Sequence, residues 1–334
     1  MYLTHGIDLA KARNARVAQD WILHPKRRMP EAETILKAVT GALCEFPRII
    51  RSVRNIRSVE THDYSFINRK GETVCGRIEG IDDTERRPLV ILDCGYKRDL
   101  FNFKLMGTVI ASLGYRVMSV RSADELKGGE AEDYMDGVNF LRFASPEFSG
   151  LLDHRTAFVV ISGGGNVLFR ACSISQKFID DNGVVCGVAI STYNSLRQQF
   201  AFMTDRLKDP NLSPNARRVL LDYQNYANRT GLTPDGDPTV FKMGSPGTYL
   251  PIIKIPVLHV HGREDDIVPV EGSIMNHRGM KEEGKDSNLI IVKGKGVHSD
   301  TGVLWRQPTN LIGMIASLMH ATKYLDERVG PIFV

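Results

Sequence analysis

Short, almost unbroken apolar runs are the feature that most restricts the fold of this chain. Six of them follow one another, at 89–92, 115–120, 157–161, 184–190, 256–260 and 289–292. Strands buried on both faces of a parallel sheet have this pattern because helices cover each face. Helical patterns alternate with the runs, at 101–113, 131–143, 167–179, 270–283 and 311–324. The alternation predicts an α/β fold with a doubly wound, mostly parallel sheet.

Two further segments belong to this framework. Residues 58–62 and 73–78 have strand patterns, and the turn formers at 68–71 between them predict a hairpin. Between 191 and 254 the alternation stops: helical patterns at 197–207 and 215–228 precede a loop rich in Pro, Gly and Asp. We interpret 192–253 as a helical cap inserted into a core formed by 57–191 and 254–334.

The sequence pattern of residues 1–56 predicts a basic helical N-terminal extension. Helical patterns at 8–23 and 31–46 are separated by two prolines, and residues 1–58 contain eleven Lys/Arg against five Asp/Glu. Such an arm is typical of a solvated helical face, which we favour, or of a surface for nucleic acid, a membrane or an acidic carrier protein. Aromatic residues do not interleave the basic ones, and zinc-finger or RNP-type motifs are absent, so we expect no nucleic-acid partner.

Composition excludes several classes of protein. A hydrophobic fraction of 42% and a charged fraction of 25% are ordinary globular values. The longest apolar run, 311–319, is far shorter than the ~18–20 residues of a membrane span. The five cysteines are odd in number and lack close ligand-like spacing, which predicts neither a disulfide framework nor a zinc site. The first thirty residues lack a secretory pattern. We therefore expect a cytoplasmic protein without a metal or organic cofactor.

Chemistry-bearing residues follow three of the apolar runs, where the carboxyl ends of parallel strands collect reactive groups. Ser162-Gly163-Gly164-Gly165-Asn166 lies between a run and a helical pattern, which predicts a serine on a sharp strand-to-helix turn. There the N–H of Gly163 could stabilise an oxyanion. Asp265 follows the next-to-last run and His298 the last. Serine, acid and histidine in this order are a candidate catalytic triad.

These motifs make residues 57–325 resemble the α/β-hydrolase superfamily. The segment 162–166 is similar to the S-x-G-G-N of many of its esterases, and 261–269 resembles its H-G-x-x-D-x-x-V-P acid loop, with Asp265 as the acid. Residues 92–96 fall where the family often has His-Gly before its second oxyanion donor. By that resemblance, the N–H of Tyr96 joins that of Gly163 in the oxyanion hole.

The sequence departs from this resemblance at two positions. Val160 replaces the usual small residue two before the nucleophile, and Cys94 replaces the usual histidine. A β-branched residue crowds a turn, and a register with Gly164 in the nucleophile position would leave an inactive fold that binds a ligand or partner. We favour Ser162 because Asn166 then occupies its place in S-x-G-G-N.

Each site residue also has a less specific interpretation. The glycines could form a phosphate loop, although G-x-G-x-x-G and G-K-[ST] are missing. Asp266 could be the acid instead of Asp265, and His298 could be a surface residue. We interpret His261 as structural, bonded to loop backbone. Cys94 is more typical of a small thiol lining a pocket than of a second nucleophile.

The substrate-binding prediction is the coarsest. Aromatic and Met residues in 192–253 either pack on the core or line an apolar cleft, as ligand sites usually do. Lys97 and Arg98 beside the predicted oxyanion hole could attract an anionic group, or face water. We predict that Cys94, Lys97, Phe200 and Met203 contact a small-molecule acyl substrate.

The leading functional hypothesis is therefore a serine hydrolase that cleaves a carboxylic ester or thioester. The same triad would serve an acyl-carrier thioesterase or acyltransferase, or a hydrolase of carbon–carbon bonds. A pseudo-hydrolase that only binds is the alternative from another class. An acyl carrier and a second copy of the chain stay open as partners.

Overall fold

The computed structural model describes residues 55–95, 100–121, 130–230, 233, 236–298 and 308–330. The chain has two compact units, Met1–Ser58 and Val59–Val334, and the fold described below is that of the second. Apart from a short 3-10 turn at Ile56–Ser58, the predicted N-terminal extension lies outside the described residues.

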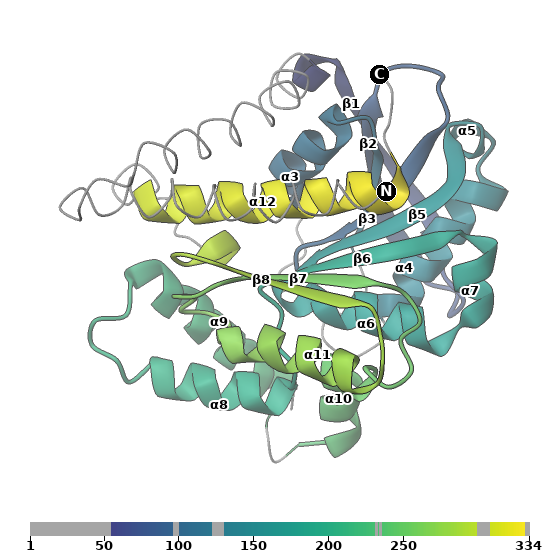
Figure 1. Ribbon diagram of the computed structural model, residues 1–334. Coiled ribbons are helices and arrows are strands. Elements are labelled where there is room, and N and C mark those ends of the chain that lie inside the picture. The colour runs from purple at the N-terminus through teal and green to yellow at the C-terminus, as the bar shows by residue number, and fades with distance from the viewer. Residues whose placement is uncertain are drawn as a thin grey trace. The chain divides into compact units, whose positions relative to one another are not determined.

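The described part of this unit contains an eight-stranded sheet (Figure 1). Its strands are β1 (Val59–Ile67), β2 (Thr73–Ile81), β3 (Arg87–Asp93), β4 (Arg116–Arg121), β5 (Leu152–Ile161), β6 (Val184–Ile190), β7 (Val257–Gly262) and β8 (Ser287–Val292). Their order is β1-β2-β4-β3-β5-β6-β7-β8. The β1–β2 and β2–β4 pairs are antiparallel and the rest are parallel. The predicted mostly parallel α/β sheet is confirmed.

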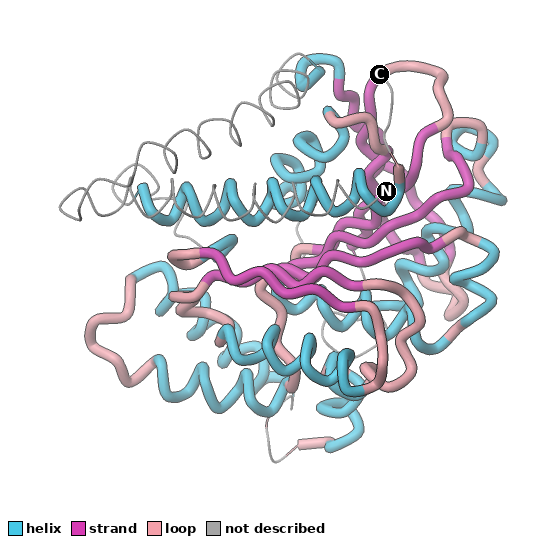
Figure 2. The backbone as a smooth tube through the Cα atoms, viewed as in Figure 1, coloured by secondary structure: helices cyan, strands magenta, loops and turns pink. Residues whose placement is uncertain are grey.

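The apolar runs form the strands because helices cover both faces of the sheet. Every residue of β3 is buried. Helices α3 (Leu100–Ser112) and α12 (Pro308–Val329) pack on one face. The opposite face is covered by α4 (Glu130–Asn139), α6 (Gly165–Ile174), α7 (Gln176–Asp181) and α11 (Val270–Glu282). Figures 1 and 2 show these two helical layers on either side of the strands.

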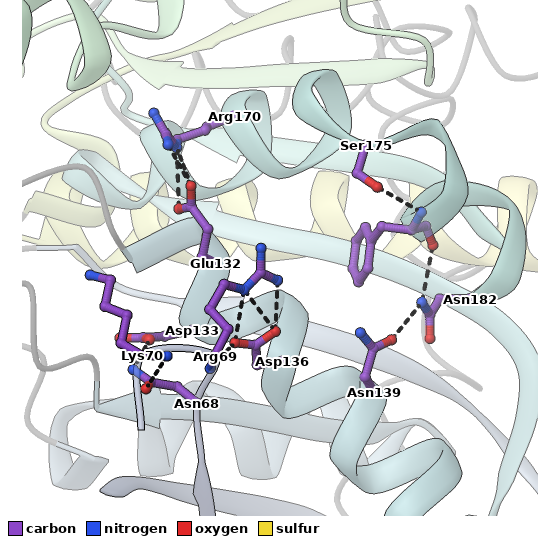
Figure 3. A network of polar contacts seen from close by, with 11 residues as sticks. Asn68, Arg69, Lys70, Glu132, Asp133, Asp136, Asn139, Arg170, Ser175 and Asn182 are labelled. Carbon is purple, nitrogen blue, oxygen red and sulfur yellow. Dashed lines mark hydrogen bonds and ion pairs between the residues drawn. The ribbon is translucent and has the colours of Figure 1, made fainter. Parts of the chain in front are cut away.

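The predicted hairpin is closed by Asn68. Its side-chain oxygen accepts hydrogen bonds from the N–H groups of Lys70 and Glu72, and its amide donates to Asp133 of α4. Arg69 forms an ion pair with Asp136 on the same helix (Figure 3). The turn between β1 and β2 is thus fixed both by its own residues and by the helix beneath it.

Two helix predictions need correction. The expected helix at 167–179 is two helices, α6 and α7, because the Ser175 hydroxyl accepts from the N–H of Phe178 and begins a new helix there. The expected helix at 131–143 ends at Asn139 and continues as a π-type turn, Phe140–Ala144, before the short helix α5 (Pro146–Ser149).

Three helices lie between β6 and β7: α8 (Leu196–Arg206), α9 (Pro214–Thr230) and α10 (Pro238–Met243). The third was expected to be loop; it forms because the Asp237 carboxylate accepts from the N–H of Thr239 and Pro238 stands in the first turn. These helices share an apolar cluster with Ile267 and Val268, which follow β7. Among the described helices, none combines the length and apolar character needed to cross a bilayer.

Candidate active site

The predicted reactive residues follow strands that run in the same direction. Ser162 directly follows β5, Asp265 follows β7, and His298 follows β8. Because β5, β6, β7 and β8 are parallel neighbours, their carboxyl ends meet at one edge of the sheet. The topology therefore brings three residues that are distant in sequence to the same edge.

Ser162 has a left-handed backbone conformation. Its φ is +55°, and among the described residues Ser191 is the other non-glycine with positive φ. A left-handed conformation costs a non-glycine residue roughly 1–2 kcal/mol. Gly164, the candidate for the alternative register, has a φ of −61° and is the N-cap residue directly before α6. Ser162 is thus the residue at the sharp turn between β5 and α6.

Val160 does not distort this turn. It belongs to β5, where it pairs with Asp93 and Ala189, and its side chain is completely buried in the core. Its φ is not positive. The branched side chain therefore packs below the turn, and the serine two residues later takes the unusual conformation.

The turn after β3 packs directly against the Ser162 turn. A Cβ on Gly95 would lie 2.7 Å from the amide nitrogen of Gly163, and one on Gly164 would lie 2.7 Å from the carbonyl oxygen of Asp93. The buried Asp93 carboxylate accepts from the N–H of Gly95 at 2.7 Å and so holds the turn closed. Tyr96 and Lys97 follow this turn but lie outside the described residues.

Asp265 and His298 are hydrogen-bonded. The distance from His298 Nδ1 to Asp265 Oδ2 is 2.7 Å. The second carboxylate oxygen, Oδ1, accepts from the N–H groups of Ile267 and Val268 at 2.9 and 3.0 Å. The acid is therefore oriented by the backbone of its own loop, and one oxygen is left to orient the imidazole.

The surroundings keep Asp265 ionised. Burial alone would raise the pKa of this carboxyl, but the charge of His298 and hydrogen bonds from His261 and His298 outweigh burial. The pKa of Asp265 consequently lies well below its ordinary value. A buried, ionised acid bonded to Nδ1 fixes the ring and stabilises an imidazolium, so that Nε2 can serve as a base.

The contacts of His261 and Asp266 distinguish the interpretations given for these two residues in the sequence analysis. The Nε2–H of His261 donates to the carbonyl oxygen of Val268 at 3.0 Å and lies 3.5 Å from Asp265 Oδ2, and its Nδ1 lies 2.7 Å from the Ser273 hydroxyl. His261 is therefore a loop-bracing residue. Asp266 forms ion pairs with Arg206 and Lys295. Of the two adjacent acids, Asp265 is the one that contacts His298.

We compared this chain with known proteins. Neither family models nor curated protein sequences match the chain. Solved structures do: an acylaminoacyl peptidase in complex with Z-Gly-Gly-Phe-chloromethyl ketone superposes with a TM-score of 0.62 at 18% identity. The esterase Pf2001 of Pyrococcus furiosus has a TM-score of 0.59 at 18% identity. The sheet and helix layout of this chain fits these structures. The protein has the α/β-hydrolase fold.

The lengths of these similar proteins differ. The alignment with the esterase covers 83% of this chain and 94% of the esterase. The alignment with the acylaminoacyl peptidase also covers 83% of this chain but only 43% of the peptidase. A puromycin-hydrolyzing peptidase of Mycobacterium tuberculosis gives a TM-score of 0.58 at 14% identity, with 40% of its length covered. The chain thus spans less than half of the peptidases and nearly all of the esterase.

The predicted substrate-binding residues have different positions in this α/β-hydrolase fold. Cys94 is partly buried beside the core of one sheet face, and Phe200 is partly buried on α8. Met203 is completely buried among the helices between β6 and β7. Met203 therefore packs the interior of these helices, and its contact with a substrate stays a prediction.

Sequence reasoning missed several polar residues around the site. Asp93 closes the turn beside Gly163, and Asn166 donates to the buried Glu130 carboxylate at 3.3 Å. The sequence signal for Asp93 was an acid at the end of an apolar run, directly before Cys-Gly. Among the described residues, no three His, Cys, Asp or Glu side chains are grouped as a metal ion would require.

Proposed function

We propose that this protein is a serine hydrolase that cleaves a carboxylic ester or thioester of an apolar acyl substrate. The observation that carries the proposal is the 2.7 Å Asp265–His298 hydrogen bond at the sheet edge that also presents the left-handed Ser162. A strained serine and a base oriented by a buried acid are the elements that nucleophilic acyl transfer requires.

In the proposed reaction, Ser162 attacks the substrate carbonyl and His298 accepts the hydroxyl proton. Asp265 stabilises the resulting imidazolium. The N–H groups of Gly163 and Tyr96 stabilise the tetrahedral oxyanion, an effect of about 3–4 kcal/mol per donor in comparable sites. His298 returns the proton to the leaving group, and water then hydrolyses the acyl-enzyme by the same steps in reverse order.

The preference for an apolar ester or thioester has two supports. The helices between β6 and β7 are held together by an apolar cluster that includes part-buried Phe200, and apolar walls suit an acyl chain. A similar solved structure that is named an esterase is covered by this chain over 94% of its own length. We propose Cys94, Lys97 and Phe200 as the residues closest to the acyl substrate.

Fluorophosphonate labelling tests the proposal directly. The wild-type protein should gain one adduct, mapped by peptide mass spectrometry to Ser162, and Ser162→Ala and His298→Ala should lose it. Ser191→Ala is the matched control, because Ser191 is the other left-handed serine but is completely buried; this variant should label like the wild type.

Turnover of a substrate panel then separates the reactions that share this triad. The panel contains p-nitrophenyl esters, acyl thioesters, N-acyl peptides and β-diketones, and we expect esters or thioesters to be cleaved fastest. A folded protein that takes no adduct, beside a control hydrolase that does, would contradict the proposal and favour a binding protein.

A further inference from the structure

Asp266 joins three segments around the candidate site. It belongs to the loop after β7 that also carries Asp265. Its Oδ1 accepts from Arg206 Nη2, at the end of α8, at 2.5 Å. Its Oδ2 forms an ion pair with Nζ of Lys295, three residues before His298. One carboxylate thus connects the acid loop, the His298 loop and the first helix between β6 and β7.

Other contacts connect the beginning of α8 to the same loop and the end of α8 to α9. The side-chain amide of Gln199 donates to the carbonyl oxygen of Ile267 at 2.7 Å. Arg206 also bonds Asp209 at 2.8 Å, and Arg217 of α9 donates to the carbonyl oxygens of Leu207 and Asp209. Arg206 therefore lies in a network that spans α8, α9 and the acid loop.

The Asp266 pairs are shielded from solvent. The side chains of Arg206, Asp266 and Lys295 are exposed by 28%, 18% and 20%. Ion pairs at this depth are screened less than fully exposed ones. Loss of the shared carboxylate would leave Arg206 and Lys295 without their common anion, so each neighbouring segment would lose one of its attachments to the loop.

We propose that Asp266 is a positioning residue for the proposed hydrolytic reaction, on which this inference rests. Through Lys295 it sets the place of the His298 loop, and through Arg206 it sets the place of α8. We call these two ion pairs of Asp266 the Lys295 arm and the Arg206 arm, and their loss has separable consequences. The Lys295 arm acts on the assembly of base and nucleophile, whereas the Arg206 arm acts on the helix that carries Phe200.

Four substitutions separate the arms. Asp266→Asn keeps the size of the side chain and removes its charge; Lys295→Met and Arg206→Met each remove one partner. Lys208→Met is the matched control, because Lys208 lies just beyond α8 and pairs with Asp205 where both are mostly exposed. The measurements are the fluorophosphonate labelling rate and the kcat and KM for acetyl and octanoyl p-nitrophenyl esters.

We expect Asp266→Asn and Lys295→Met to lower the labelling rate and kcat about tenfold, because small displacements of a base are costly. Arg206→Met should raise KM for the octanoyl ester about fivefold while its labelling rate stays within about twofold of wild type. Asp266→Glu should recover part of the lost rate, and Lys208→Met should change neither quantity.

The outcomes distinguish this inference from the proposed function. An unlabelled wild-type protein overturns both. A labelled wild type with an equally labelled, equally active Asp266→Asn variant overturns the role of Asp266 alone. Circular dichroism and urea unfolding verify that each variant folds; if Asp266→Asn does not, Lys295→Met and Arg206→Met decide the question, and wild-type kinetics in both would overturn it.

Discussion

Ser162 combines a polar side chain with a conformation that serine avoids. At φ +55° a Cβ is crowded by the backbone, whereas glycine occupies this region readily. If packing were the only requirement, glycine would therefore be favoured at this position. Four of the five residues from 161 to 165 are already apolar or glycine. A hydroxyl at this turn supports the reactive role proposed for Ser162.

Ser162→Gly should accordingly stabilise the protein while abolishing hydrolysis. Relief of roughly 1–2 kcal/mol of strain, less the ~0.5–1 kcal/mol entropy cost of glycine, leaves a gain of about 0.5–1 kcal/mol. Urea unfolding measures it, with Ser162→Ala, which keeps the strain, as the reference. Equal stability of the Gly and Ala variants would argue against strain at this turn.

His259 of β7 is a buried titratable residue outside the candidate site. It has no exposed surface and stacks on Phe169 of α6, with ring centroids 5.9 Å apart. Burial, followed by the nearby His277 and His261, lowers the pKa of His259 to about 3. The folded protein therefore keeps this ring neutral at acidity where an unfolded chain would protonate it.

This lowered pKa predicts a loss of stability in acid. Between pH 6.5 and 3 the unfolded state binds the proton and the folded state does not, so the free energy of unfolding falls as pH falls. At pH 5 the loss from His259 is about 2 kcal/mol relative to pH 7. His259→Leu should reduce the difference between urea unfolding at pH 7 and pH 5 by that amount; an unchanged difference would mean that other groups cause it.

At the scale of elements, the turn after β3 and the turn before α6 act as one unit. Gly95 has a φ of +79°, and its Cα faces the Gly163 amide so closely that a side chain has no room. The turn that leads to Tyr96 thus keeps its position only while residue 95 is glycine.

Gly95→Ala should therefore destabilise the protein by more than the backbone strain of an alanine at positive φ. Gly71 is the matched control: its φ is +80°, but a Cβ there would meet nothing within 4 Å. We expect Gly71→Ala to lose about 1–2 kcal/mol of stability with full activity. Gly95→Ala should lose about 1–3 kcal/mol more and at least about tenfold in kcat. Equal effects of the two on stability and ester hydrolysis would disprove the contact.

The elements themselves show what local sequence can and cannot predict. Runs of apolar residues identified β3 to β8, and burial on both faces explains such runs in β3, β6 and β7. The break at Ser175 was missed because an apolar period continues across it, and only a side-chain hydrogen bond reveals the cap. The same limit applies to α10, whose signals were the Asp237-Pro238 pair within a loop-like composition.

The residues of the candidate site also fall into those that local sequence can predict and those that it cannot. Ser162, Asp265 and His298 could be proposed together because each follows a strand, and strand ends can be located from apolar runs. Arg206 and Lys295 were not found, because their shared partner Asp266 is 60 and 29 residues away in sequence. Pairing at such distances follows from the assembled fold, and a single sequence carries no local pattern for it.

For the whole molecule, the three apolar clusters predict unequal stability. The sheet lies between two of them, whereas the helices between β6 and β7 share a third, smaller one. Hydrogen exchange should therefore be slowest in β3 and β5 and at least about tenfold faster in α9, which exposes Leu221 and lies outside the sheet. Equal protection of α9 and β5 would show that both open together.

The helices between β6 and β7 also form the connection that two parallel strands require. The two strands are parallel and in register from Gly187↔Val257 to Ile190↔Val260. The chain must therefore return along the sheet between them, and a connection between parallel strands takes about a dozen residues or more. If 192–253 were excised, only residues 191 and 254–256 would remain between the two strands, too few for such a crossover. A truncated chain without this crossover would lose the adjacency of β6 and β7, and with it the sheet edge that Ser162 and Asp265 share.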